Sequence, residues 1–178
     1  MSESDWQARR AAAGDAAAFG VLVRRHQSKL RGFLLRMTRG DRALADDLAQ
    51  ETFLEAFRKI GQYGQGPFFG WLCAIAYSRY LMAARKRKLE SLDETMEVPG
   101  AAPDTETANL VRLDLEKALA HLAPAQRAAL TLCFALGFSH EEAAAALEMP
   151  LGTLKSHVTR GREKLAGILA VWRNQAVP

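Results

Sequence analysis

A run of polar and cationic residues near the C-terminal end has the composition of a surface that binds nucleic acid. Between residues 151 and 165, hydroxyl, imidazole, ammonium and guanidinium side chains are interspersed with the apolar Leu154 and Val158. Such polar groups can bind phosphate oxygens and the edges of bases in the major groove. The predicted contacts to duplex DNA are Thr153, Lys155, Ser156, His157, Thr159, Arg160, Arg162 and Lys164.

These side chains need a helix that a second helix holds at a fixed angle, and the sequence predicts both. Ser139 and Glu142 have the spacing of a capping box, which starts a short helix. Pro150 ends that helix before the second one begins. The segment 138–165 is therefore predicted to be a helix-turn-helix. Glu148 lies in its turn, where a left-handed conformation would cost about 1 kcal/mol.

Other side chains that could do chemistry do not combine into an active site. Asp46 and Asp47 are adjacent on a predicted helix, so their carboxylates point about 100° apart. No Ser/His/Asp set or phosphate-binding glycine loop accompanies them. Cys73, Cys133 and the four histidines lack the spacing of metal ligands. We expect no enzymatic activity, no metal and no cofactor.

The elements that position these residues are all predicted to be helices, because apolar residues recur at helical spacing almost throughout. Asp15 and Asp41 are predicted to cap two helices, and Gly40 ends the first of them. A glycine-rich loop at residues 61–67 precedes a third helix over residues 68–88, which ends in four consecutive cations. The fold class is therefore all-α.

Charge is unevenly distributed along the chain. Residues 1–90 contain 16 Lys and Arg against 9 Asp and Glu, a balance of +7. Residues 91–115 contain 1 against 6, a balance of −5, and residues 116–178 contain 7 against 5, a balance of +2. The acidic segment has no sustained apolar period, which is typical of a linker. We predict two small helical domains, residues 1–89 and 110–178, joined by a flexible acidic linker at residues 90–109.

The sequence also favours a particular cellular location. No stretch approaches the roughly 18 uninterrupted apolar residues that a membrane span needs. The first ten residues lack the apolar core of a secretory signal. We expect a cytoplasmic protein with no direct membrane insertion.

Two classes of DNA-binding protein fit the helix-turn-helix. A conventional dimeric transcription regulator would use it to read a palindrome. That alternative leaves unexplained the segment from Tyr63 to Lys88, which combines 6 of the 14 aromatic residues with a cationic end. Aromatic rings beside a cationic groove can stack on unpaired bases, although Phe68 and Trp71 sit where helix packing would bury them. The segment favours a protein that opens DNA.

Two sets of motifs, in this order and around this linker, resemble the extracytoplasmic-function (ECF) sigma factors of bacterial RNA polymerase. The N-terminal set comprises residues 14–19 (GDAAAF), 45–53 (ADDLAQETF) and 71–76 (WLCAIA). The C-terminal set comprises residues 122–127 (LAPAQR), 138–144 (FSHEEAA) and 150–157 (PLGTLKSH). The resemblance extends over nearly the whole chain.

The resemblance implies a role for each domain. The first, region 2, would bind the polymerase clamp helices and open the minus-10 element, and the second, region 4, would read the minus-35 element. Implied contacts to core polymerase are Asp46, Asp47, Gln50, Glu51, Phe53, Glu55 and Phe57. Implied contacts to the minus-10 element are Tyr63, Ser78, Arg79, Arg85, Lys86, Arg87 and Lys88. Tyr63 is the expected base-stacking residue, because the matching family loop captures a flipped base.

The resemblance also implies partners and regulation. We expect a dissociable subunit that directs core polymerase, through its clamp helices and flap, to specific promoters and so initiates transcription. An anti-sigma factor, membrane-anchored in some members of the family, is expected to hold it inactive until a stress signal arrives. The free chain is expected to be a monomer. The long linker would allow the two domains to move between a closed inhibited state and an open polymerase-bound one.

Overall fold

The computed structural model describes residues 2–64, 66–90 and 115–175, and these residues contain helices and no strand. The N-terminal lobe consists of α1 (Glu3–Ala12), α2 (Ala16–Met37), α3 (Arg42–Lys59), a short 3₁₀ turn η1 (Ile60–Gln62) and α4 (Phe68–Glu90). The C-terminal lobe consists of a helical turn at residues 115–120, α6 (Pro124–Leu130), the π-helical turn η2 (Thr131–Ala135), α7 (His140–Ala146) and α8 (Leu151–Gln175). The all-α prediction is confirmed.

Local capping sets where the long helices of the N-terminal lobe begin. The Asp15 side chain accepts a hydrogen bond from the Ala18 N–H at 3.1 Å, and Asp41 accepts one from Leu44 at 3.0 Å. Gly40 follows α2 at a φ of 89°, a conformation that favours glycine. Both predicted caps and the predicted end of α2 are therefore confirmed. The helix α1 was not among the elements expected from the sequence.

The helix-turn-helix is present as expected. Ser139 and Glu142 form a complete capping box at the start of α7, with bonds of 3.1 and 2.8 Å. Glu148 has a φ of 50°, so the turn does place a side chain with a Cβ in the left-handed region. Leu154 and Val158 of α8 are buried against the rest of the lobe.

A glycine allows α8 to approach α6 closely. A Cβ built on Gly161 would lie 3.0 Å from Cδ1 of Leu130 and 3.4 Å from Cβ of Gln126. Gly167, two turns further along α8, has nothing within 4 Å of the same position. The crossing of α6 and α8 therefore depends on the missing side chain at residue 161.

Enlarging Gly161 should destabilise the C-terminal lobe. We expect Gly161→Leu to lower the free energy of unfolding by about 1–3 kcal/mol, because the new side chain overpacks the α6–α8 crossing. The matched variant Gly167→Leu should leave stability unchanged or raise it by up to about 1 kcal/mol through better helix propensity. Urea denaturation followed by circular dichroism measures both. Equal stability of the two variants would contradict the packing argument.

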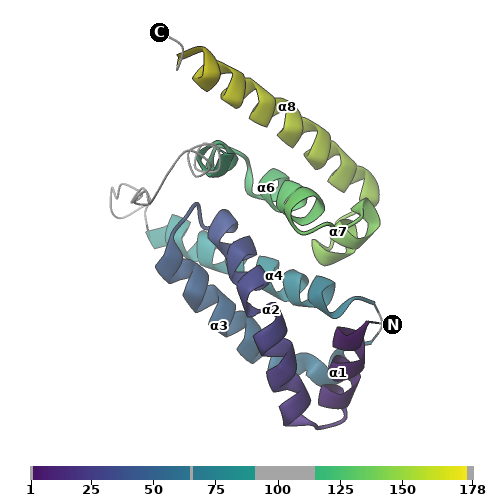
Figure 1. Ribbon diagram of the computed structural model, residues 1–178. Coiled ribbons are helices and arrows are strands. Elements are labelled where there is room, and N and C mark those ends of the chain that lie inside the picture. Colours follow the sequence, from purple (N-terminus) through teal and green to yellow (C-terminus); the bar gives the residue numbers. More distant parts are fainter. Residues whose placement is uncertain (1, 65, 91–114, 176–178) are drawn as a thin grey trace.

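The two lobes pack against each other. Figure 1 shows α6 and α7 lying between α8 and the N-terminal lobe, with α7 against α4 and α6 near α2. The Phe69 ring of α4 lies 6.0 Å from the Phe138 ring that precedes α7, measured between centroids. A single cluster of buried apolar side chains spans both lobes. The predicted linker lies, except for Glu90 at the end of α4, outside the described residues.

Arg127 of α6 is the largest fully buried side chain, and it contacts both lobes. Its guanidinium donates hydrogen bonds to the carbonyls of Leu119, Ala120 and Leu122 in its own lobe, at 2.9 to 3.3 Å. Across the interface it donates to the Met37 carbonyl at 2.6 Å and the Arg36 carbonyl at 3.4 Å, both at the C-terminal end of α2. A helix C-terminus has unsatisfied carbonyls and a partial negative charge, so a cation there is stabilising.

Candidate functional site

The outward face of α8 presents most of the predicted duplex-DNA contacts to solvent. Leu154, Val158 and Gly161 form the buried stripe of the helix, and the polar residues occupy the positions between them. Seven of the eight predicted contacts are exposed, and His157 is half-buried. The exposed residues are Thr153, Lys155, Ser156, Thr159, Arg160, Arg162 and Lys164.

Two members of this set already have partners within the chain. The Ser156 hydroxyl donates to the Gly152 carbonyl at 3.0 Å, as serines in helices often do. The Arg162 guanidinium lies 5.7 Å from the centre of the Phe134 ring, at the flank of α8 rather than on its outward face. The exposed members of the predicted set that have no such partner among the described residues are Thr153, Lys155, Thr159, Arg160 and Lys164.

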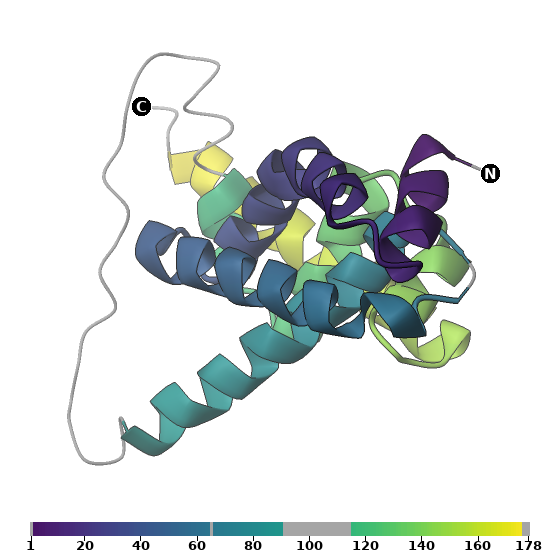
Figure 2. The same ribbon diagram turned by 90° about the horizontal axis from the view of Figure 1, so that it is seen from below.

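The cationic end of α4 extends away from the body of the protein. Figure 2 shows the C-terminal half of this helix projecting beyond α3. Arg87 forms an exposed ion pair with Asp41 at 3.2 Å. The predicted contacts that are exposed on this part of the helix are Ser78, Arg85, Lys86, Arg87 and Lys88, and the apolar Met82 and Leu89 are exposed beside them.

Arg79 differs from the other cations of α4. Its guanidinium pairs with Glu55 of α3, and Glu51 lies 3.8 Å away. Glu55 also accepts a hydrogen bond from Lys59, and the bonds from Lys59 and Arg79 hold the pKa of Glu55 below its usual value. Arg79 thus joins α4 to α3, and it would have to leave Glu55 to bind a phosphate.

Tyr63 occupies the floor of the glycine-rich loop instead of its surface. It is only 8% exposed, and its ring lies edge-on to Phe68 and Trp71, with centroid distances of 5.8 and 5.6 Å. Its hydroxyl donates to the Gly66 carbonyl and lies 3.3 Å from Oδ1 of Asp5. Burial is the main reason that the pKa of Tyr63 is raised to about 12. In this arrangement the ring is not accessible to a base.

The remaining aromatic residues of this segment also belong to the core. Phe68, Tyr77 and Tyr80 are buried, and Phe69 and Trp71 are half-buried and pack against the core cluster. The prediction that Phe68 lies in the core is confirmed. The same prediction for Trp71 is confirmed only in part, because its side chain is half-buried. The described residues around Tyr63 that face solvent are Gly61, Gln62, Gly64, Gly66 and Pro67, of which the last three lie between Tyr63 and α4.

A hollow of about 600 Å³ lies between α2 and α3, and we call it the α2–α3 hollow. Apolar side chains dominate it, and Leu54 and Phe57 are 58% and 50% exposed. At its edge, Arg31 donates two hydrogen bonds of 2.7 Å to Asp46. Its lining residues are Phe19, Val23, Gln27, Arg31, Asp46, Ala49, Gln50, Phe53, Leu54 and Phe57.

The α2–α3 hollow brings together part of the set predicted for polymerase binding. Asp46, Gln50, Phe53 and Phe57 line it, whereas Asp47, Glu51 and Glu55 do not. Leu54 was missed by the sequence reasoning, although it is one of the most exposed large apolar side chains described. Its position next to Phe53 could have suggested that the apolar stripe of α3 is too wide for α2 and α4 to cover.

A smaller hollow, of about 240 Å³, lies in the C-terminal lobe next to α2. Phe134, at its edge, is 63% exposed and was not predicted as a functional residue. The lining also includes Leu115, Leu119, Leu130 and Leu165, together with Arg36 and Arg162. We call it the C-terminal hollow.

Within residues 2–64, 66–90 and 115–175, no group of three or more His, Cys, Asp or Glu side chains is arranged to hold a metal ion. None of the helices in these ranges has the length and apolar character to span a membrane.

Comparison with known families assigns both halves of the chain. Residues 22–90 match the family model "Sigma-70 region 2", and residues 112–165 match "Sigma-70, region 4". The first matched range covers α3, α4 and most of α2, and the second covers the helix-turn-helix.

Relatives and solved structures match over most of the chain. The ECF RNA polymerase sigma factor SigE of Mycolicibacterium smegmatis is 38% identical over 89% of this chain, which spans 65% of that relative's length. The ECF RNA polymerase sigma factor EcfG of Rhodopseudomonas palustris is 37% identical over 80% of each chain. The sigma factor RpoE of Bartonella quintana, solved in complex with the anti-sigma factor NepR, is 31% identical over 86% of this chain and 97% of its own, with a TM-score of 0.77.

Proposed function

Because this chain belongs to the extracytoplasmic-function group of RNA polymerase sigma factors, we propose that it directs core RNA polymerase to specific promoters and initiates transcription there. It supplies promoter specificity, and the polymerase makes the phosphodiester bonds. The observation that supports this most strongly is the presence, on one chain and in this order, of region 2 and region 4. A dimeric repressor would need only the second of them.

The α2–α3 hollow is the proposed contact with core polymerase. An exposed apolar patch rimmed by polar side chains is typical of a protein–protein interface. Leu54, Phe53 and Phe57 would provide the apolar centre. The acidic and amide side chains around it would contact the polymerase clamp: Asp46, Asp47, Gln50, Glu51 and Glu55.

The minus-10 contact is proposed for the glycine-rich loop and the exposed end of α4. The loop places Gly64, Gly66 and Pro67 in solvent above the buried Tyr63. Glycines allow the backbone to come close to a flipped base. We assign Tyr63 to holding the loop in shape, and Ser78 with Arg85, Lys86, Arg87 and Lys88 to the DNA strands near the melted edge. Arg79 would join them only after leaving Glu55.

The minus-35 contact is proposed for α8, and it gives a quantitative test. We expect Arg160→Ala or Lys155→Ala to weaken binding to a minus-35 duplex and to reduce the slope of log affinity against log salt by about 0.9 for each lost phosphate contact. The exposed Arg24 of α2 offers a charge-matched control, so Arg24→Ala should leave the slope unchanged. Fluorescence anisotropy at several salt concentrations measures the slopes. If neither α8 variant changed the slope of log affinity against log salt, Lys155 and Arg160 would not belong to the minus-35 contact.

An anti-sigma factor is the proposed regulator of this chain. One solved neighbour is a complex of a sigma factor with such a protein. The α2–α3 hollow and the C-terminal hollow each expose apolar surface that an inhibitor could cover. The C-terminal hollow, with the exposed Phe134, is also the proposed contact with the polymerase flap. An inhibitor that covers both hollows would exclude polymerase from both lobes.

Run-off transcription tests the proposed function as a whole. The purified chain is added as the only sigma factor to core RNA polymerase, with DNA from the neighbourhood of its own gene as template. We expect a discrete transcript that depends on the chain. No promoter-specific product on any such template, together with binding of a dimer to a palindrome, would replace the proposal with a dimeric regulator.

A further inference from the structure

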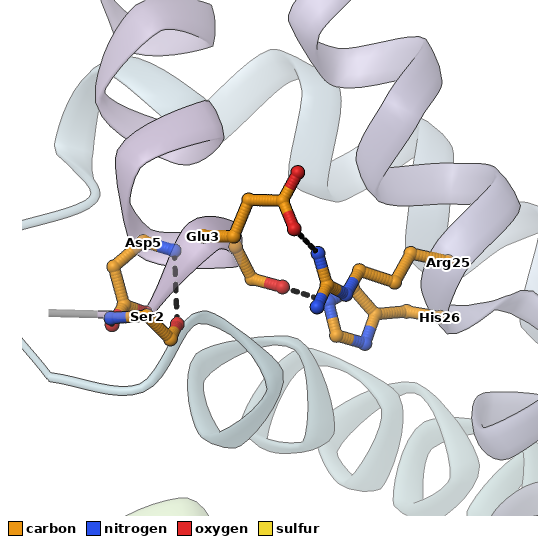
Figure 3. Close-up of polar contacts among 6 residues, drawn as sticks. Ser2, Glu3, Asp5, Arg25 and His26 are labelled. Carbon is orange, nitrogen blue, oxygen red and sulfur yellow. Dashed lines mark hydrogen bonds and ion pairs between the residues drawn. The ribbon is translucent and has the colours of Figure 1, made fainter.

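The N-terminal helix α1 is fastened to the rest of the N-terminal lobe by three consecutive residues. Glu3 accepts a hydrogen bond from Arg25 of α2 at 2.6 Å, and the Ser4 hydroxyl lies 2.9 Å from Nε2 of the buried His26. Figure 3 shows Glu3 facing Arg25 across the gap between α1 and α2, with Asp5 near Ser2 at the start of α1. Two of the three residues thus hold α1 on α2, and the third makes a different contact.

Asp5 contacts the start of α4 instead of α2. Its Oδ1 accepts a hydrogen bond from the Phe68 N–H at 3.0 Å, and its Oδ2 accepts one from the Ser2 N–H at 2.8 Å. Burial raises the pKa of Asp5, but the bonds from Phe68 and Ser2 lower it by more, so the carboxylate stays ionised. Phe68 is the first residue of α4, and its N–H has no acceptor within the helix.

Asp5 therefore performs a capping function that the local sequence cannot. The residue before Phe68 is Pro67, which has no side-chain oxygen to accept a hydrogen bond. A carboxylate at a helix N-terminus both satisfies an N–H and interacts favourably with the helix dipole. Here the carboxylate comes from 63 residues earlier in the chain.

The Oδ1 atom of Asp5, which caps α4 at Phe68, also contacts Tyr63 at the opposite end of the glycine-rich loop. Oδ1 is 3.3 Å from the Tyr63 hydroxyl and 3.0 Å from the Phe68 nitrogen. These two residues are buried on either side of the exposed Gly64, Gly66 and Pro67. The Asp5 carboxylate thus fixes the distance between Tyr63 and Phe68, and the exposed residues of the loop lie between these two.

We propose that Asp5 is a positioning residue for promoter opening: it holds the minus-10 loop in the shape that receives an unpaired base. The proposal rests on the proposed function, because it assumes that the loop contacts the minus-10 element. Asp5 itself lies beneath the loop and does not touch DNA. The helix α1 is then part of the opening machinery, although it contributes no DNA contact of its own.

The test measures opening in the assembled holoenzyme. Core polymerase saturated with each variant is mixed with a duplex promoter that contains 2-aminopurine in the minus-10 element, and the rise in fluorescence reports unstacking. We expect Asp5→Ala to slow opening about five- to tenfold. Asp5→Asn, which retains an oxygen acceptor for the Phe68 N–H, should restore the rate to within about twofold of the parent chain.

Two further measurements separate positioning from a general loss of structure. Glu3→Ala removes the ion pair that holds α1 on α2 without touching the loop, and it should open DNA at the normal rate. Asp5→Ala should also bind core polymerase and a minus-35 duplex with the parent's affinities. A parallel loss of those affinities, or no rescue by Asp5→Asn, would overturn the proposal in favour of a purely structural role.

A loop variant distinguishes failure of this proposal from failure of the proposed function. Tyr63→Ala removes the other partner of the Asp5 carboxylate and should also slow opening. If Tyr63→Ala is slow and Asp5→Ala is normal, the loop acts in opening but Asp5 does not position it. If both variants open DNA normally, the loop itself is not the minus-10 contact.

Discussion

Replacing Arg127 with methionine should lower the free energy of unfolding by about 3–5 kcal/mol. Methionine fills much of the same volume but donates no hydrogen bond, so five carbonyls around this fully buried position lose the guanidinium donor. The Leu119 and Arg36 carbonyls would keep backbone hydrogen bonds from Leu122 and Arg39. Leaving the other three buried carbonyls without a donor costs more than the net value of each bond. Urea denaturation, followed by circular dichroism, measures the loss.

A second arginine at the same interface provides the control. Arg36 pairs with Glu116 at 3.1 Å, and both side chains are about one-third exposed. Arg36→Met should therefore cost less than about 1 kcal/mol, because solvent screens the pair. If both variants lowered the free energy of unfolding equally, burial would not make the contacts of Arg127 more stabilising than the exposed ion pair of Arg36.

The contacts of Arg127 also bear on how the lobes separate. The minus-10 and minus-35 elements are centred about 25 base pairs apart. At a rise of 3.4 Å per base pair, their centres lie roughly 85 Å apart along B-DNA. In this structure Phe69 of α4 and Phe138, next to the helix-turn-helix, are 6.0 Å apart. A chain that bound both elements would have to break the two bonds from Arg127 to α2. Its three bonds within the C-terminal lobe could remain.

Replacing Leu54 with aspartate should weaken binding to core polymerase by roughly 30-fold or more. Leu54 is the most exposed apolar side chain in the α2–α3 hollow, so its burial by a partner would contribute most to the free energy of binding. A charge at the centre of such a contact would also be desolvated without a partner. Titration of labelled chain with core polymerase, followed by fluorescence anisotropy, measures the dissociation constant.

The matched control is another exposed leucine, placed outside both hollows. Leu89, near the end of α4, is 70% exposed, and Leu89→Asp should leave core affinity within about twofold of the parent. Both variants should unfold at the parent's urea midpoint, since neither side chain is buried. Normal core affinity in Leu54→Asp would show that the polymerase binds elsewhere.

The features predicted correctly from the sequence are those set by short-range interactions. Ser139 and Glu142 are three residues apart, so their capping box follows from the local sequence alone. The caps at Asp15 and Asp41 and the left-handed Glu148 have the same local origin. Periodicity likewise places Leu154 and Val158 in the core, because each helix turn repeats the same orientation.

The features that the sequence did not predict depend on contacts between distant residues. Tyr63 appeared to be an exposed loop residue, yet its hydroxyl lies beside a carboxylate 58 positions earlier. Arg127 occurs within a helical pattern, and nothing local indicates that it would be buried against α2. The exposure of Leu54 follows from how much of α3 its neighbours cover, which periodicity does not measure.

The bond between Arg127 and Met37 has a consequence for synthesis of the chain on the ribosome. Arg127 follows Met37 by 90 residues, so the C-terminal end of α2 is made first and remains without its buried cation. At 5–20 residues per second, the interval lasts roughly 5–18 s. During that time water must satisfy the Met37 carbonyl, so the N-terminal lobe exists for several seconds without the buried hydrogen bond that Arg127 later donates to α2.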